Sequence, residues 1–139
     1  MKGQFVADLF SGHGGVSKEV RKMGFTAKEW ELLHGEDSDL TRPVVRAHLK
    51  ADIRAGHIIA VMLAHPCSSF SPARDRTSVI RSKEFPWGLP QHLLNEKDQG
   101  KVKVGNMCFK AAFKVIKDLD YFKIPWISEN PHASKCWYL

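Results

Sequence analysis

The stretch QFVADLFSGHGGVSKEVRKMG, residues 4–24, decides the fold of this chain. Its first part, residues 4–9, is mostly apolar and predicts a buried strand. A glycine-rich turn follows at residues 10–15, and the apolar residues from Val16 to Met23 then repeat at the spacing of an amphipathic helix. A strand, a glycine-rich turn and a helix begin many nucleotide sites, because the free N–H groups at the helix start favour an anion or a carboxylate. The same pattern also serves as an ordinary tight turn, so by itself it predicts an α/β fold and not a ligand.

The rest of the chain continues this alternation of strands and helices. Strands are predicted at residues 26–32, 58–63 and 124–128, and helices from Pro43 to about Gly56 and from Lys101 to about Leu119. Residues 72–98 contain several prolines and are predicted to be irregular. Strands that alternate with helices predict a mostly parallel sheet with helices on both faces.

Length and composition are those of an ordinary globular protein. The chain has 139 residues, which predicts a single domain over residues 1–139, with 43% hydrophobic and 26% charged residues. No apolar run is long enough to span a membrane. The odd number of cysteines favours reduced thiols and an intracellular, soluble protein. The formal net charge of +6 is compatible with a nucleic-acid partner, although many basic domains have solvated lysines.

The segment AHPCSSFS, residues 64–71, follows the apolar run 58–63. Cys67 therefore comes just after the carboxyl end of a predicted buried strand, where open α/β sheets place their chemistry. This position favours a nucleophile, while a buried structural thiol is the alternative. The loops after residues 9, 64 and 128 all follow predicted parallel strands, so we expect them to emerge at one edge of the sheet.

Three motifs, in this order, resemble the cytosine carbon-5 DNA methyltransferase family: DLFSGHGG (8–15), PCSSFS (66–71) and ENP (129–131). The resemblance covers most of the chain and corresponds to the catalytic domain of the family. It implies a Rossmann-like methyltransferase fold, S-adenosylmethionine as methyl donor, DNA as substrate and no metal. For a eukaryotic source, the resemblance also implies a nuclear protein.

The resemblance also implies the catalytic residues. Cys67 would be the nucleophile, because a thiolate that adds to the cytosine ring makes the neighbouring carbon reactive toward an electrophilic methyl group. Glu129 would stabilise the charge that builds on the ring, with its proton retained through burial. Asn130 would orient this loop. The target base would have to leave the DNA helix to be reached.

Donor-binding residues follow from the same resemblance, with the glycine-rich loop at the methionine end of the donor. Glu31 would accept from the ribose, as an acid at that distance from the loop commonly does, and Glu29 is its rival. Asp39 would bind the adenine amine, and Asp37 could replace it. The implied set is Asp8, Phe10, Ser11, Gly12, Gly14, Gly15, Glu31, Asp39 and Pro66.

The segment of residues 74–83, which follows Cys67, is basic. It predicts contacts with nucleic-acid phosphates, and a solvated surface loop is an equal alternative. The residues assigned to nucleic-acid binding are Ser69, Arg74, Arg76, Arg81 and Lys83.

The sequence departs from the family in two places and lacks several of its parts. His65 stands where the family usually has proline or a small residue, and Pro131 replaces the usual valine. The family's Arg-x-Arg element, target-recognition region and closing motif would lie beyond Leu139. We therefore expect either a truncated catalytic domain, completed by a C-terminal region or a partner chain, or a minimal relative.

Other functions remain as alternatives. The chain could be a non-catalytic protein that binds S-adenosylmethionine or nucleic acid, an adenine amino-group methyltransferase, or an RNA cytosine methyltransferase. A zinc site is a weaker hypothesis, and its ligands would be His65, Cys67, His132 and Cys136.

Overall fold

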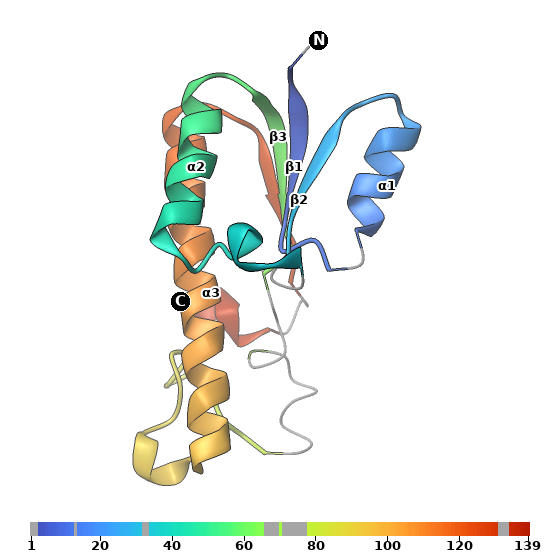
Figure 1. Ribbon diagram of the computed structural model, residues 1–139. Helices are drawn as coiled ribbons and strands as arrows, with labels where there is room; N and C mark the ends of the chain where they lie inside the picture. The colour runs from blue at the N-terminus through green and yellow to red at the C-terminus, as the bar shows by residue number, and fades with distance from the viewer. Residues whose placement is uncertain (1–2, 13, 32–33, 66–69, 71–77, 131–133) are drawn as a thin grey trace. The chain divides into compact units, whose positions relative to one another are not determined.

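The computed structural model describes residues 3–12, 14–31, 34–65, 70, 78–130 and 134–139. Its strands are β1 (Phe5–Leu9), β2 (Ala27–Trp30), β3 (Ile58–Leu63) and β4 (Trp126–Ser128), and its α-helices are α1 (Gly15–Lys22), α2 (Pro43–Arg54) and α3 (Glu96–Tyr121) (Figure 1). Short 3-10 helices lie at Glu36–Ser38, Gln91–Leu93 and Lys135–Tyr138. All strand pairs are parallel, in the order β2-β1-β3-β4. The α/β prediction is confirmed.

The order of the strands explains where the helices lie. The chain steps from β1 outward to β2, then returns past β1 to β3 and continues to β4. Because crossovers between parallel strands are right-handed, a change in direction moves the connecting helix to the other face of the sheet. Figure 1 shows α1 on one face, with α2 and the C-terminal half of α3 on the other. The direction changes between β1 and β3, and ligands of open α/β sheets bind at such a switch point.

The main core lies between the sheet and the pair α2 and α3. Alternate residues of β1 and β3 point into it, since successive side chains of a strand face opposite sides. Residues of α2 and α3 spaced by about one helical turn complete it. The buried set is Phe5, Ala7, Leu9, Leu40, Val45, Leu49, Ile53, Ile58, Val61, Leu63, Ala112, Val115 and Leu119.

Helix α1 differs from its prediction in what it buries. Val16 and Met23, expected on its apolar face, are 39% and 73% exposed, whereas Ser17 is fully buried. The helix has eight residues, and the hydrogen bonds of Ser17 to Asp8 bring this residue, instead of the valine and methionine, against the sheet.

Helix α3 begins earlier than predicted, at Glu96 instead of Lys101. The side-chain oxygen of Asn95 accepts a hydrogen bond of 2.8 Å from the backbone N–H of Asp98, which is the geometry of an N-terminal cap. The spacing of Val104 from Cys108 and Ala111 predicts that all three share one apolar face, but Val104 is 57% exposed.

Strand β4 is shorter than predicted and begins at Trp126. Two features of the preceding turn explain this. Lys123 has a positive φ of 57°, and Pro125 has no N–H to donate. Its carbonyl still accepts from the N–H of Val61 at 3.0 Å, so the proline guides the strand into the sheet.

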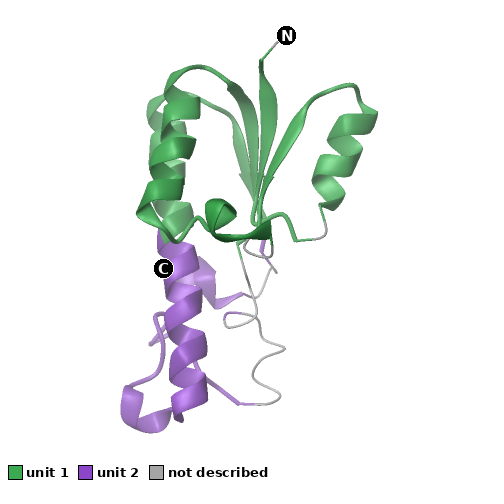
Figure 2. Cartoon of the chain, viewed as in Figure 1, with its two compact units in different colours: residues 1–65, 111–129 green, residues 66–110, 130–139 purple. Residues whose placement is uncertain are grey.

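Where one domain was predicted, the chain divides into two compact units (Figure 2). Unit 1 comprises residues 1–65 and 111–129 and holds the sheet with its core, and unit 2 comprises residues 66–110 and 130–139. Helix α3 contributes its N-terminal part to unit 2 and its C-terminal part to unit 1.

Unit 2 is organised around the buried side chain of Arg81. Its Nη1 donates to the carbonyl of Pro86 at 2.8 Å and to Oδ1 of Asn106 at 2.7 Å, and its Nη2 donates to the carbonyl of Val102 at 3.1 Å. The guanidinium carbon lies 3.7 Å from the ring centroid of Phe70. One cation thus connects residues that are distant in sequence.

Candidate active site at the carboxyl edge of the sheet

Backbone hydrogen bonds bring three chain segments together at the carboxyl ends of β1, β3 and β4. The N–H of Ala64 donates to the carbonyl of Leu9 at 3.2 Å, and the N–H of Glu129 donates to the carbonyl of Leu63 at 2.8 Å. The glycine-rich loop, the segment that leads to Cys67 and the Glu129 motif therefore leave the sheet from neighbouring strands. All the residues that form these bonds belong to unit 1.

The glycine-rich loop is held against the end of β2. The N–H groups of Phe10 and Ser11 both donate to the carbonyl of Trp30, at 2.7 and 3.2 Å. Phe10, Gly12 and Gly14 have positive φ values of 58°, 56° and 72°. Gly14 precedes the first residue of α1, where such a backbone is easiest for glycine.

Both candidate acids for the ribose lie against this loop. Oε2 of Glu31 accepts a hydrogen bond of 2.7 Å from the N–H of Gly12. The carboxylate of Glu29 lies where a side chain at Gly14 would begin. The half-buried Glu31 stands just past the end of β2, which is the position the ribose interaction requires.

The hydroxyl oxygen of Ser11 is buried and has no hydrogen-bond partner among the described residues. Such an atom is costly unless something else satisfies it. Together with the carboxylate of Glu31, it gives this end of the sheet a polar group suited to a polar ligand.

Asp8 holds α1 and does not offer its carboxylate to a ligand, which corrects its assignment as a donor-binding residue. It is 2% exposed, and Oδ2 accepts from the Ser17 hydroxyl at 2.8 Å and from the Ser17 N–H at 3.3 Å. Burial raises the pKa of Asp8, and the two bonds from Ser17 partly oppose this effect. No sequence pattern links a helical serine to a strand aspartate, so Ser17 is recognised as the partner of Asp8 only in the folded chain.

Asp39 makes local bonds in the turn before α2. Its Oδ1 accepts from the N–H of Thr41 at 3.0 Å and from the Thr41 hydroxyl at 2.6 Å. Asp39 is half-buried and its alternative Asp37 is exposed. The adenine contact therefore stays a prediction for either residue.

The proposed nucleophile Cys67 and its neighbour Pro66 lie outside the described residues. The preceding residue, His65, is 5% exposed, and burial lowers its pKa. The last described residue before Cys67 is therefore buried.

Glu129 is exposed, where burial was expected as the reason for a retained proton. Asn130 is half-buried. The structure thus places the Glu129 backbone at the predicted edge, while the described residues leave its side chain exposed.

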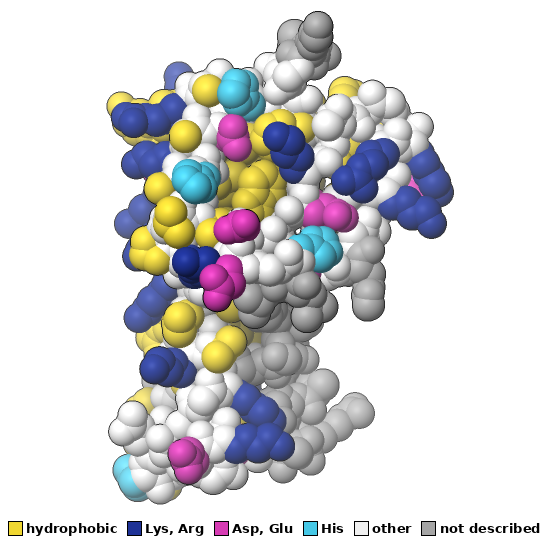
Figure 3. All heavy atoms as spheres, viewed as in Figure 1, with side chains coloured by type: hydrophobic (Ala, Val, Ile, Leu, Met, Phe, Trp, Pro, Cys, Tyr) yellow, Lys and Arg dark blue, Asp and Glu magenta, His cyan; other side chains and the backbone are white. Residues whose placement is uncertain are grey.

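The nucleic-acid assignment of Arg81 is wrong for this structure. Arg81 is 0% exposed, and its donors face the interior of unit 2. Lys83 is exposed, with Nζ 5.6 Å from the ring centroid of Tyr138. Ser69, Arg74 and Arg76 lie outside the described residues. Figure 3 shows Lys and Arg side chains over α1 and along the helices on the other side of the sheet.

No family model, curated protein or solved structure matches the chain. Within the described part of the chain, no group of three His, Cys, Asp or Glu side chains could hold a metal ion. None of the described helices has the length and apolar character needed to cross a membrane. The class that the fold and site define is therefore an α/β protein with an all-parallel, four-stranded sheet and a polar, glycine-rich carboxyl edge.

Proposed function

We propose that this chain has a Rossmann-like methyltransferase fold and transfers a methyl group from S-adenosylmethionine to carbon 5 of cytosine in DNA, through a covalent adduct with Cys67. The observation that carries the proposal is the pair of backbone bonds, Ala64 to Leu9 and Glu129 to Leu63. They support the proposal because DLFSGHGG, ENP and the described segment that leads to PCSSFS leave the sheet from neighbouring strands, as the resemblance to the cytosine methyltransferase family requires.

The donor would be held at the ends of β1 and β2. Ser11 and the backbone of Gly12 would contact its methionine end, and Glu31 would accept from its ribose hydroxyls. When bound, S-adenosylmethionine supplies an electrophilic methyl group. Asp8 would act on donor binding indirectly, because its hydrogen bonds to Ser17 fix the start of α1, which directly follows the glycine-rich loop.

Cys67 would attack the ring carbon next to the one that is methylated. The sulfur–carbon bond forms as the ring double bond opens, and electron density moves toward the carbon that receives the methyl group. That carbon would take the methyl group, with S-adenosylhomocysteine as the leaving group. Transfer of the proton on that carbon to a base would then re-form the ring double bond, break the sulfur–carbon bond and release Cys67 as the thiolate. Glu129 would donate a hydrogen bond or a proton at the ring nitrogen, and Asn130 would orient the loop. Because Glu129 is exposed, we expect the substrate base itself to bury its carboxyl group.

DNA that carries 5-fluorocytosine tests the proposal, because fluorine cannot leave as a proton does and the adduct persists. The chain, the donor and this DNA should give a covalent complex in a denaturing gel. Cys67→Ala should abolish it, and Cys108→Ala should not, since Cys108 lies on α3 and is 8% exposed. A complex that survives Cys67→Ala would assign the nucleophile elsewhere.

Donor binding is measured separately by calorimetry, so that a protein that only binds can be told from an enzyme. Glu31→Gln should weaken S-adenosylmethionine binding more than Glu29→Gln does. Binding without any adduct on DNA or RNA would favour the non-catalytic alternative. An adduct formed on 5-fluorocytidine RNA alone would favour an RNA substrate.

A further inference from the structure

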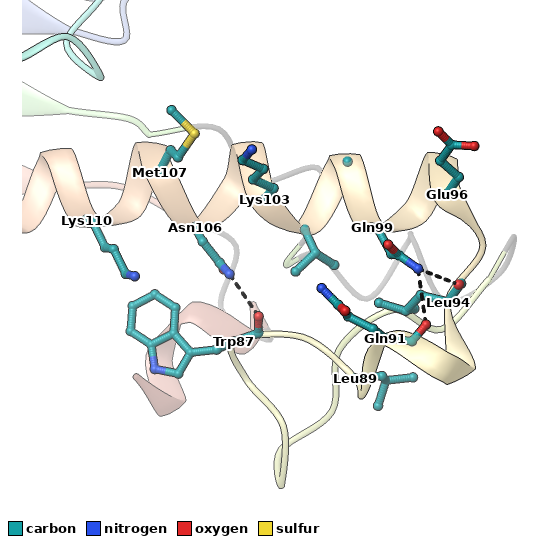
Figure 4. A pocket seen from close by; sticks show the side chains of 12 residues that line it. Trp87, Leu89, Gln91, Leu94, Glu96, Gln99, Lys103, Asn106, Met107 and Lys110 are labelled. Carbon is teal, nitrogen blue, oxygen red and sulfur yellow. Dashed lines mark hydrogen bonds between the residues drawn. The ribbon is translucent and has the colours of Figure 1, made fainter.

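Unit 2 contains a hollow that the proposed reaction does not use. It lies between the N-terminal half of α3 and the segment of residues 87–94, and its volume is about 570 Å³ (Figure 4). Small-molecule sites usually measure about 300–1,000 Å³ and combine apolar or aromatic walls with a few polar groups. This hollow has Trp87 near one end and side-chain amides and lysines along its length.

Trp87 is a fixed aromatic surface. Its carbonyl accepts a hydrogen bond of 2.9 Å from Nδ2 of Asn106. Its indole meets the ring of Phe109 edge-on, with 5.7 Å between centroids and 77° between planes. Gly88 lets the backbone approach α3, because a Cβ there would clash with Val102. Although the residue is held in this way, it is 43% exposed.

Positive charge accompanies this ring. Nζ of Lys110 lies 5.2 Å from the indole centroid. Lys103 lines the same hollow, about 10 Å further along the axis of α3 at 1.5 Å per residue. The acidic residue of the lining, Glu96, stands at the opposite end from Trp87 in Figure 4.

Side-chain amides also line the hollow. Nε2 of Gln99 donates to the carbonyls of Gln91 and Leu94, at 3.2 and 3.1 Å. These bonds fix the side chain of Gln99, and the exposed Gln91 contributes a second amide to the lining. Aromatic faces bind nucleobases by stacking, and lysines bind the adjoining phosphates.

We propose that this hollow binds single-stranded nucleic acid, with one base stacked on Trp87 and separate phosphates at Lys110 and Lys103. The ring provides the face that every base can use, and the two lysines provide the charge complementarity. The proposal goes beyond the methyl transfer reaction, since it requires neither the donor nor Cys67. Binding in this hollow would give the chain a contact with single-stranded nucleic acid in addition to the contact of the target base with Cys67.

Two fluorescein-labelled probes of equal charge test it by anisotropy: a 12-nucleotide oligothymidylate and a 12-unit abasic strand. The unmodified chain should bind the thymidylate about tenfold more tightly, because stacking contributes energy that phosphates alone do not supply. Equal affinity for the two probes would overturn the proposal and indicate general attraction to polyanions. Neither probe contains cytosine, so this result is independent of methyl transfer.

Variants then locate the site. Trp87→Ala should remove the preference for thymidylate, and Trp137→Ala should keep it, because Trp137 is a comparably exposed tryptophan of unit 2 that does not line the hollow. Equal behaviour of these two variants would also overturn the proposal.

The lysines have their own control. The double variant Lys103→Gln, Lys110→Gln should reduce the magnitude of the slope of log affinity against log salt by about 1.4, since each of the two phosphate contacts on a single strand contributes about 0.7. The control double variant, Lys18→Gln with Lys22→Gln on α1, removes the same charge from unit 1. Its slope should remain steeper than the slope of the Lys103, Lys110 double variant. Equal slopes for the two double variants would exclude the hollow as the phosphate site.

Discussion

Replacing Arg81 by methionine would remove a guanidinium from the interior of unit 2 and keep most of the apolar length of the side chain. The variant loses donors to the carbonyls of Pro86 and Val102 and to Oδ1 of Asn106, at 2.8, 3.1 and 2.7 Å. It also loses the cation 3.7 Å from the centroid of the Phe70 ring. The acceptors stay in place, so the cost comes mainly from groups left without a donor.

Two opposing contributions set the magnitude. Each hydrogen bond from a charged donor stabilises by about 1.5–3 kcal/mol. Burial lowers the pKa of Arg81 to about 10, and this change corresponds to a burial cost of about 3 kcal/mol at 1.36 kcal/mol per pKa unit. Water can reach the half-buried Pro86 and Asn106 in the variant and recovers part of the loss. We therefore expect Arg81→Met to lower the free energy of unfolding by about 2–4 kcal/mol.

Urea unfolding followed by circular dichroism and tryptophan fluorescence measures this loss. Lys83→Met is the matched control, since Lys83 is exposed and its replacement should change stability by less than about 0.5 kcal/mol. Arg81→Lys should lie between them, because a lysine keeps the charge but not the planar array of donors. A methionine variant as stable as the Lys83 control would refute the view that this cation holds unit 2 together.

Three further predictions concern unit 1 and α3. Gly14→Ala should lower the free energy of unfolding by about 1–2 kcal/mol, because the backbone φ of Gly14 is 72°. Gly100→Ala, at an open helical position, should instead raise the free energy of unfolding by about 0.5–1 kcal/mol. Urea unfolding that gives the two variants changes of the same sign would contradict this prediction. Ser17→Ala should cost about 1–3 kcal/mol at neutral pH, because buried Asp8 loses a donor; an unchanged melting curve would show that the bond contributes nothing. Because burial raises the pKa of Asp8, its stabilising contribution is complete below about pH 4 and is lost as pH rises through the raised value. The stability of the unmodified chain relative to Asp8→Asn should fall over that window, and parallel pH profiles would contradict the assignment.

Local sequence signals determined most of the secondary structure. The β-branched run of β3 lies between Gly56 and Pro66 and was predicted with both its ends, and Pro43 marks the start of α2. These features work because proline, glycine and side-chain periodicity restrict the backbone residue by residue. The convergence of the candidate site at one edge followed from the rule for parallel strands and needed no coordinates.

The tertiary structure alone decided what each side chain does at these positions. The sequence gives no signal that Arg81 faces inward to Asn106, that Asp8 binds Ser17, or that Glu31 binds the backbone of Gly12. Periodicity shows which residues share a face of an element, and it does not show what covers that face. Burial, and with it the pKa of a charged group, depends on partners brought together from distant parts of the chain, so only the folded chain separates a buried arginine from one free to meet a phosphate.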